Sequence, residues 1–140
     1  MAPHAILWPI VAMVALVAVV NVRIFFERKR QVRAEGIHMR EIPSASQMAT
    51  RFADTRAADN YRNLFEMPVL FYAALLVAFG IGAATPLTVG LAWAYVGLRI
   101  VHSAIHCGYN RVRDRLYAYL ASNIVLWTLW ILLGIALLQR

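Results

Sequence analysis

Four polar residues near the middle of the chain have the types and the spacing to bind a small charged molecule. Asp59, Arg62, Asn63 and Glu66 stand at positions i, i+3, i+4 and i+7, which share one face of a helix. An arginine binds a carboxylate through two parallel hydrogen bonds, and a glutamate accepts hydrogen bonds from an ammonium group. The spacing therefore predicts a helical face that recognises a charged ligand.

Two later segments carry polar faces of the same kind, and a third segment adds two polar residues near its end. The members are Arg99, His102, Ser103 and His106 in one segment, Arg115, Tyr119 and Ser122 in the next, and Asn21 and Arg23 in the earliest. Ionisable groups within membrane spans usually face the interior of a bundle or a water-filled cavity. We therefore expect these faces to meet in one polar cavity that opens to the cytoplasm.

The composition is that of a membrane protein. Of the 140 residues, 61% are hydrophobic and the mean hydropathy is +0.60, whereas a soluble domain is about half apolar. The net charge of +7 comes from thirteen arginines and one lysine against seven acidic residues. These arginines cluster beside apolar runs, which indicates orientation in a membrane rather than binding to nucleic acid. Cys107 is the only cysteine, so no disulfide can form within the chain.

Hydropathy and breaker residues predict a single all-α domain of four membrane-spanning helices. The expected spans cover about residues 5–26, 50–81, 87–107 and 113–138. The first run lacks the basic start and the small-residue cleavage site of a signal peptide, so we interpret it as a span. Residues 27–55 are expected to form a loop whose second half, from Ala45, can begin the second helix, so that this helix starts at about Ala49 or at Arg56. Pro68 is expected to kink the second helix because proline removes a backbone hydrogen bond.

The distribution of arginine predicts the orientation in the membrane. The first and third loops are basic, and the second loop has no charged residue. Basic loops stay in the cytoplasm, so the first and third loops are expected there and both termini on the opposite side.

Simpler structural roles remain open for several of these residues. Arg23, Arg28 and Arg62 can extend to lipid phosphates from the ends of their helices. Glu66 can form a structural ion pair with Arg62 or Arg99.

The two histidines also have the i, i+4 spacing of a metal site. A Cys or carboxylate ligand at a suitable spacing and an HExxH sequence are both missing from the chain, so we do not expect a metal at His102 and His106.

These polar faces resemble the MAPEG family, the membrane-associated proteins in eicosanoid and glutathione metabolism. The family's second helix carries Arg-x-x-x-Asn-x-x-Glu, followed shortly by proline. Asn63-x-x-Glu66 with Pro68 is similar to the second half of that pattern, and Asp59 occupies the position of the arginine.

A second register is also open on this helix. Arg56-Ala57-x-x-Asn60 resembles the family's Arg-Ala-x-x-Asn, but Asn63 then replaces the glutamate. We prefer the first register because Asn63, Glu66 and the nearby proline agree together.

The later helices extend the resemblance over the whole chain. Arg99-x-x-His102 is similar to the family's Arg-x-x-His, with His106 at the position of a tyrosine, and Arg115 and Tyr119 match an arginine and a tyrosine of the fourth helix. The resemblance implies a left-handed four-helix bundle that forms a homotrimer, with glutathione bound between subunits as a co-substrate.

The resemblance also implies roles for individual residues. Arg115, with Tyr119, would act on the glutathione thiolate, because a nearby cation lowers the pKa of a thiol. The residues expected to bind glutathione are Arg23, Arg62, Asn63, Glu66, Arg99, His102 and His106.

Three classes of function follow from this interpretation. The first is a glutathione-dependent transferase or peroxidase that acts on lipophilic electrophiles reaching it from the membrane. The second is a non-catalytic MAPEG-like protein that binds lipid or acts as a scaffold. The third is a small four-helix transporter, for which Glu66 is a partial match, although its position near the cytoplasmic side argues against this class.

Overall fold

The computed structural model describes residues 2–36, 44 and 52–139. Every regular element in these residues is helical: η1 (Pro3–Leu7), α1 (Trp8–Glu35), α3 (Arg56–Asn63), α4 (Met67–Gly80), α5 (Pro86–Cys107) and α6 (Val112–Leu138). Within this described part of the chain, four helical units are long and apolar enough to cross a membrane: Pro3–Glu35, Arg56–Gly80, Pro86–Cys107 and Val112–Leu138. The expected four-span, all-helical architecture is therefore confirmed.

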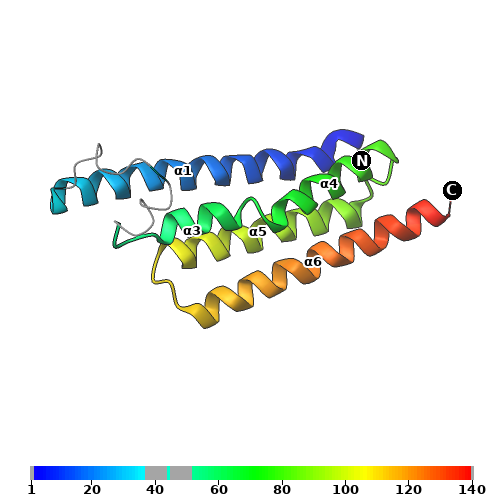
Figure 1. The fold of residues 1–140 in the computed structure, drawn as a ribbon. Coiled ribbons are helices and arrows are strands. Elements are labelled where there is room, and N and C mark those ends of the chain that lie inside the picture. Colours follow the sequence, from blue (N-terminus) through cyan, green and yellow to red (C-terminus); the bar gives the residue numbers. More distant parts are fainter. Residues whose placement is uncertain (1, 37–43, 45–51, 140) are drawn as a thin grey trace.

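The helices lie side by side and alternate in direction, so both ends of the chain lie at the same end of the bundle (Figure 1). α5 packs along α6 and against α1 and α3, while α4 packs against η1 and α6. The core contains apolar side chains from every span, and Phe71 of α4 stacks on Tyr95 of α5 with ring centroids 4.3 Å apart. This core holds the polar segments of α3, α5 and α6 at the opposite end from the termini.

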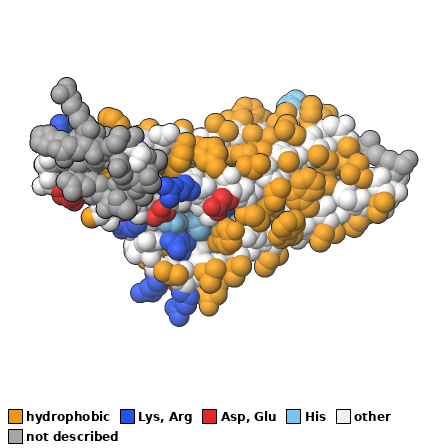
Figure 2. All heavy atoms as spheres, viewed as in Figure 1, with side chains coloured by type: hydrophobic (Ala, Val, Ile, Leu, Met, Phe, Trp, Pro, Cys, Tyr) orange, Lys and Arg blue, Asp and Glu red, His pale blue; other side chains and the backbone are white. Residues whose placement is uncertain are grey.

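Large apolar side chains cover most of the surface shown in Figure 2, and charged side chains gather toward one end. Exposed Val, Leu, Ile, Phe and Trp residues occur along every span. A water-soluble monomer rarely exposes so much contiguous apolar surface. The surface therefore fits the hydrocarbon of a bilayer, and the charged end fits its interface with water.

The first helix is longer than the sequence analysis predicted. It continues through Arg28, Lys29 and Arg30 and ends at Glu35, not at Phe26. Charged residues are good helix formers in water, so the end of the apolar run does not end the helix. Gly36 ends it instead, with φ of 61° and a hydrogen bond from its N–H to the carbonyl of Val32.

The second span is broken rather than gently kinked. α3 ends at Asn63, the chain turns through residues 64–66, and α4 begins at Met67 with Pro68 in its first turn. Proline lacks an N–H and its ring collides with the preceding turn, so the helix ends before it and a new helix starts at it. The expected start of this span at residue 50 lies outside the described residues, but residues 52–55 are not helical, so the prediction of a helix there is wrong and the helix begins at Arg56.

A tight turn between α5 and α6 sets how the last two helices meet. A Cβ on Gly108 would lie 2.7 Å from the carbonyl oxygen of Ala104, so this position admits only glycine without a shift of backbone. Asn110 adopts a left-handed φ of 50°, which asparagine tolerates better than most residues. The turn brings the first turn of α6 beside the last turn of α5.

Candidate functional site

A cavity of about 370 Å³ lies between α3, α5 and α6, near the end of the bundle opposite the termini. We call it the α3–α5–α6 cavity. Its walls are Asp59, Arg62, Asn63, Glu66, His102, His106, Val112, Arg115, Leu116 and Tyr119. Figure 2 shows acidic, basic and histidine side chains gathered in this part of the surface. The predicted polar faces of three helices therefore do meet in one place.

A chain of hydrogen bonds runs from the bundle interior to this cavity through Asn63. Nη2 of Arg99 donates to the side-chain oxygen of Asn63 at 2.5 Å and to its backbone carbonyl at 3.1 Å. Nδ2 of Asn63 then donates to Oε2 of Glu66 at 3.2 Å. Because Arg99 fixes which end of the amide faces inward, the N–H end is left to orient the exposed Glu66 carboxylate.

Arg99 itself lies behind the cavity wall and has no exposed surface. Its guanidinium carbon lies 6.0 Å from the centre of the Tyr119 ring. Within the described residues, Nε and Nη1 have no hydrogen-bond partner, and no carboxylate pairs with this arginine within 4.0 Å. Burying a cation with unpaired donors costs free energy, so Arg99 is held here by the surrounding fold.

Arg115 is held at the mouth of the cavity from two sides. Its Nη1 donates to Oδ1 of Asn110 at 3.0 Å and lies 3.2 Å from Nε2 of His106. A guanidinium can only donate, so Nε2 of His106 accepts and that ring carries its proton on Nδ1. The α5–α6 turn thus positions Nη1 of the guanidinium, and the other donors of Arg115 make no hydrogen bond to the described residues.

The backbone of Arg115 also fixes His102. Nδ1 of His102 lies 3.1 Å from the carbonyl oxygen of Arg115, and a carbonyl can only accept, so Nδ1 carries the proton. Tyr119 packs beside this ring with centroids 5.9 Å apart, and His106 does so at 5.7 Å. His102, His106, Arg115 and Tyr119 therefore form one contiguous wall.

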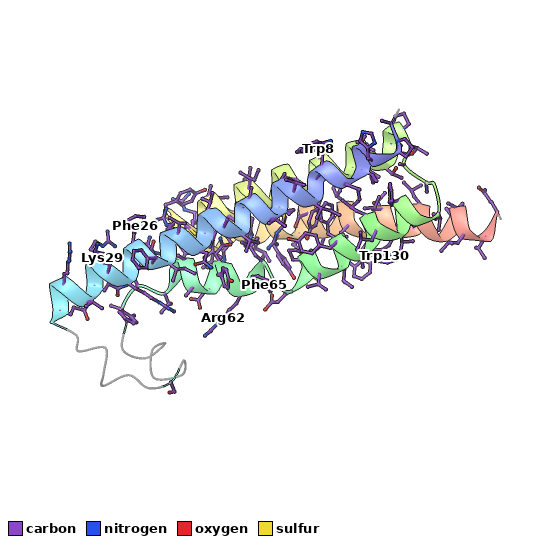
Figure 3. All side chains as sticks on the ribbon, turned by 90° about the horizontal axis from the view of Figure 1, so that it is seen from above. Trp8, Phe26, Lys29, Arg62, Phe65 and Trp130 are labelled. Atoms are coloured by element: carbon purple, nitrogen blue, oxygen red, sulfur yellow. The ribbon has the colours of Figure 1, made fainter. Side chains whose placement is uncertain are left out.

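The acidic and basic groups in the cavity are partly paired. Arg62 lies 3.9 Å from Asp59, with both side chains substantially exposed, and Asp59 also accepts a hydrogen bond of 2.8 Å from Thr55. Arg62 points outward from α3 (Figure 3). No ion pair joins Glu66 to Arg62 or Arg99 within 4.0 Å among the described residues, so its carboxylate remains available to a ligand.

Arg23 does not join this cavity within one chain, contrary to the sequence-based expectation. It donates to Glu27 at 2.9 Å and to the backbone carbonyl of Cys107. It lines a separate cavity with Arg56. The rotation of α1 against the end of α5 places it there, and that rotation depends on packing rather than on spacing along the sequence.

The two possible registers on the second span assign the family pattern to residues that lie in different parts of the structure. In the register that we preferred, Asn63 and Glu66 lie in the α3–α5–α6 cavity, with Asp59 beside them. In the other register, Arg56 lies in the separate cavity and Asn60 is buried. Asn60 accepts from Ser103 at 3.3 Å and lies 3.5 Å from the Cys107 sulfur.

The contacts of Asn60 were missed by sequence reasoning. Ser103 belongs to the predicted polar face of the third span, and this was the available signal that it faces the second span. Asn110 gave no such signal, because its role depends on the left-handed turn after α5.

Hydrogen bonds to Asp54 link the start of α3 to the end of α1. Gln31 exchanges two hydrogen bonds with its backbone, of 3.0 and 2.9 Å, and Arg56 binds its carboxylate at 2.9 and 2.7 Å. The hydrogen bonds from Arg56 lower the pKa of Asp54 from 3.8 to about 2. These contacts set where α3, and with it Asn63, begins.

We expect the stability that Asp54 provides to be lost in acid. Its folded-state pKa is depressed, so its contribution is complete above the unfolded-state value near 4 and disappears as the pH falls toward 2. Thermal unfolding in detergent from pH 5 to pH 2 should therefore show a steeper loss of Tm in the wild type than in Asp54→Asn. Glu35→Gln, which removes an exposed carboxylate, is the control and should keep the wild-type slope.

The fold and the cavity together define a multi-pass helical membrane protein with a polar site at one end. The family model for the MAPEG family matches residues 5–135 of the 140. The chain belongs to the MAPEG family, whose members are membrane proteins of eicosanoid and glutathione metabolism. No significant match was found to a curated protein or to a solved structure.

Proposed function

We propose that this chain binds glutathione in the α3–α5–α6 cavity and promotes attack of its thiolate on lipophilic electrophiles. It would act as a transferase that forms a thioether, or as a peroxidase in which two glutathiones are oxidised to the disulfide while a peroxide is reduced to an alcohol and water. The observation that carries the proposal is the placement of Glu66, Arg62 and Arg115 around one cavity. Glutathione has two carboxylates and one ammonium group, and these three side chains offer matching charges. The cavity volume of about 370 Å³ also lies within the range of ligand sites, roughly 300–1,000 Å³.

The cavity offers partners both for the ammonium group and for the carboxylates of glutathione. The Arg99–Asn63–Glu66 chain presents a carboxylate that can take an ammonium group. Arg62 and Arg115 offer guanidinium donors to the carboxylates or the sulfur, and the buried charge of Arg99 adds a positive potential behind them. Bound glutathione would supply a thiol nucleophile, and Val112 and Leu116 would meet an apolar second substrate at the cavity edge.

The assembly and the orientation belong to the same proposal. We infer a left-handed bundle that forms a homotrimer, with the open side of the cavity facing a neighbouring subunit. The basic ends of α1 and α6 would face the cytoplasm, with both termini opposite. Mass measurement in detergent should return three copies of the chain, and a stable monomer that binds glutathione would contradict a site between subunits.

We expect Glu66→Gln to weaken glutathione binding about tenfold with little change in Tm. The exposed carboxylate has no ion-pair partner in the described chain, so removing its charge leaves no buried cation newly unpaired. A hydrogen bond to a charged group contributes about 1.5–3 kcal/mol, of which glutamine keeps part. Isothermal titration with glutathione in detergent measures the loss.

Glu35, which lies outside the α3–α5–α6 cavity, provides a matched control for this titration. Glu35→Gln removes an exposed carboxylate at the end of α1 and should leave the glutathione affinity unchanged. Wild-type protein that binds no glutathione would contradict the proposal and favour a non-catalytic member of the family. A large fall in Tm with unchanged affinity would instead assign Glu66 a structural role.

A further inference from the structure

We propose that the separate cavity at the end of α1 binds the headgroup of an anionic phospholipid. Arg23, Phe26, Glu27, Arg30 and Arg56 line this cavity of about 240 Å³, which we call the α1 basic cavity. Three guanidinium groups from two helices converge on it. None of these residues lines the α3–α5–α6 cavity, so the proposal does not rest on glutathione binding there.

The depth of the cavity matches the level of lipid phosphates. α1 has 28 residues, or about 42 Å at 1.5 Å per residue, whereas the hydrocarbon of a bilayer is roughly 30 Å thick. The apolar run occupies the hydrocarbon, so the charged last three turns of α1 project into the headgroup layer. Figure 3 shows Phe26 and Lys29 on this part of the helix. Phe26 is 61% exposed, so its ring would meet the acyl chains of a lipid bound in this cavity.

Two of the three guanidinium groups are fixed in place before any lipid binds. Arg23 is held by Glu27 and by the Cys107 carbonyl, and Arg56 by Asp54 and by the Gly108 carbonyl. Both carbonyls belong to the end of α5 and the turn after it. An arginine has five N–H donors, so each retains donors for a phosphate. Groups that are already ordered lose less entropy on binding.

The third guanidinium, that of Arg30, makes the fewest contacts with the described protein. Arg30 is 70% exposed and lies 3.8 Å from the carboxylate of Asp54, with no closer polar contact among the described residues. The charged groups that line or face the cavity are three arginines (Arg23, Arg30 and Arg56) and two carboxylates (Glu27 and Asp54), so their net charge is +1. Lys29 and Arg33 on the same helix segment add to the positive potential. Basic pockets between helices at this depth suit anionic headgroups.

The test measures lipid binding to the purified full chain by native mass spectrometry. Phosphatidylglycerol, phosphatidylcholine with the same acyl chains, and soluble glycerol phosphate are titrated separately. We expect phosphatidylglycerol to bind more tightly than phosphatidylcholine and glycerol phosphate not to displace it. One arginine near a membrane surface contributes about 1 kcal/mol, so Arg30→Gln should weaken phosphatidylglycerol binding about fivefold.

Arg113→Gln is the matched control, because Arg113 is 72% exposed and has a similar weak pairing of 3.8 Å with Asp114. It should keep the wild-type lipid preference, and Arg30→Lys should keep most of it because the charge remains. Equal binding of the two lipids, or equal losses in Arg30→Gln and Arg113→Gln, would overturn the proposal. Displacement by glycerol phosphate would instead assign the cavity to a free anion.

Discussion

Arg115→Ala is expected to lose about 10²- to 10³-fold of the glutathione-dependent kcat, which is the usual cost of removing one donor to a developing anion. The structure places this guanidinium at the cavity mouth, fixed by Asn110 and His106. A guanidinium cannot act as a base at physiological pH, so its effect would be electrostatic. It would stabilise a thiolate held in the cavity.

The same substitution should raise the thiol pKa of bound glutathione. A free thiol has a pKa near 8.5, and a close cation brings it to about 7 or below. Each unit of that shift corresponds to about 1.4 kcal/mol. Thiolate absorbance recorded against pH for wild type and Arg115→Ala measures the difference directly.

Two further variants separate the charge of Arg115 from its other effects. Arg115→Lys keeps a charge but loses the planar fork that reaches both Asn110 and His106, so it should retain partial activity. Arg113→Ala removes an exposed arginine two residues away and should behave as wild type. Identical thiol pKa values in wild type and Arg115→Ala would remove Arg115 from the mechanism.

Spacing along the sequence predicted which residues share a helical face, but not how the faces contact one another. Asp59, Arg62, Asn63 and Glu66 line one cavity, but Glu66 does so from the turn after α3 and not from the helical face that the spacing predicted. The hydrogen bond from Arg99 to Asn63 depends on the register between α3 and α5, which the core packing sets. Within one chain Arg23 lies outside this cavity, and nothing in its spacing shows which neighbour α1 turns it toward.

Hydropathy predicted the membrane spans better than it predicted the helix ends. The apolar run of the first span stops near Phe26, but its helix continues in water to Glu35 because Gly36 is the first residue that breaks it. In the second span, Pro68 marked the irregularity, and the break falls in the residues before the proline because its steric conflict is with the preceding turn. Local backbone chemistry at Gly36 and Pro68, rather than hydropathy, therefore sets where these helices end.

The second large effect is expected at Arg99, which we assign as a positioning residue. It does not line the cavity and acts through Asn63, whose amide it holds so that Nδ2 points to Glu66. Arg99→Met keeps a long side chain but releases this amide and removes the buried charge. We expect glutathione binding to weaken about 10- to 100-fold, the range that corresponds to losing an interaction of about 1.5–3 kcal/mol.

Thermal stability separates this role from a structural one. Removing one partner of a satisfied buried ion pair usually costs about 3–5 kcal/mol. Arg99 has no such partner in the described chain and two of its nitrogens are unpaired, so Arg99→Met should lower the free energy of unfolding of the ligand-free protein by less than this. Its Tm should instead lose most of the increase that glutathione gives the wild type.

A double-mutant cycle tests the chain from Arg99 through Asn63 to Glu66. If Arg99 acts by orienting Glu66, its loss matters less once Glu66 no longer carries a charge, so the two effects on glutathione affinity should not add. Arg99→Met combined with Glu66→Gln should therefore bind glutathione about as weakly as Arg99→Met alone. The effects of Arg113→Gln and Glu66→Gln on glutathione affinity should simply add, because Arg113 contacts none of Arg99, Asn63 and Glu66. Additive losses for Arg99 and Glu66 would mean that Arg99 acts on the ligand through its charge and not through Asn63.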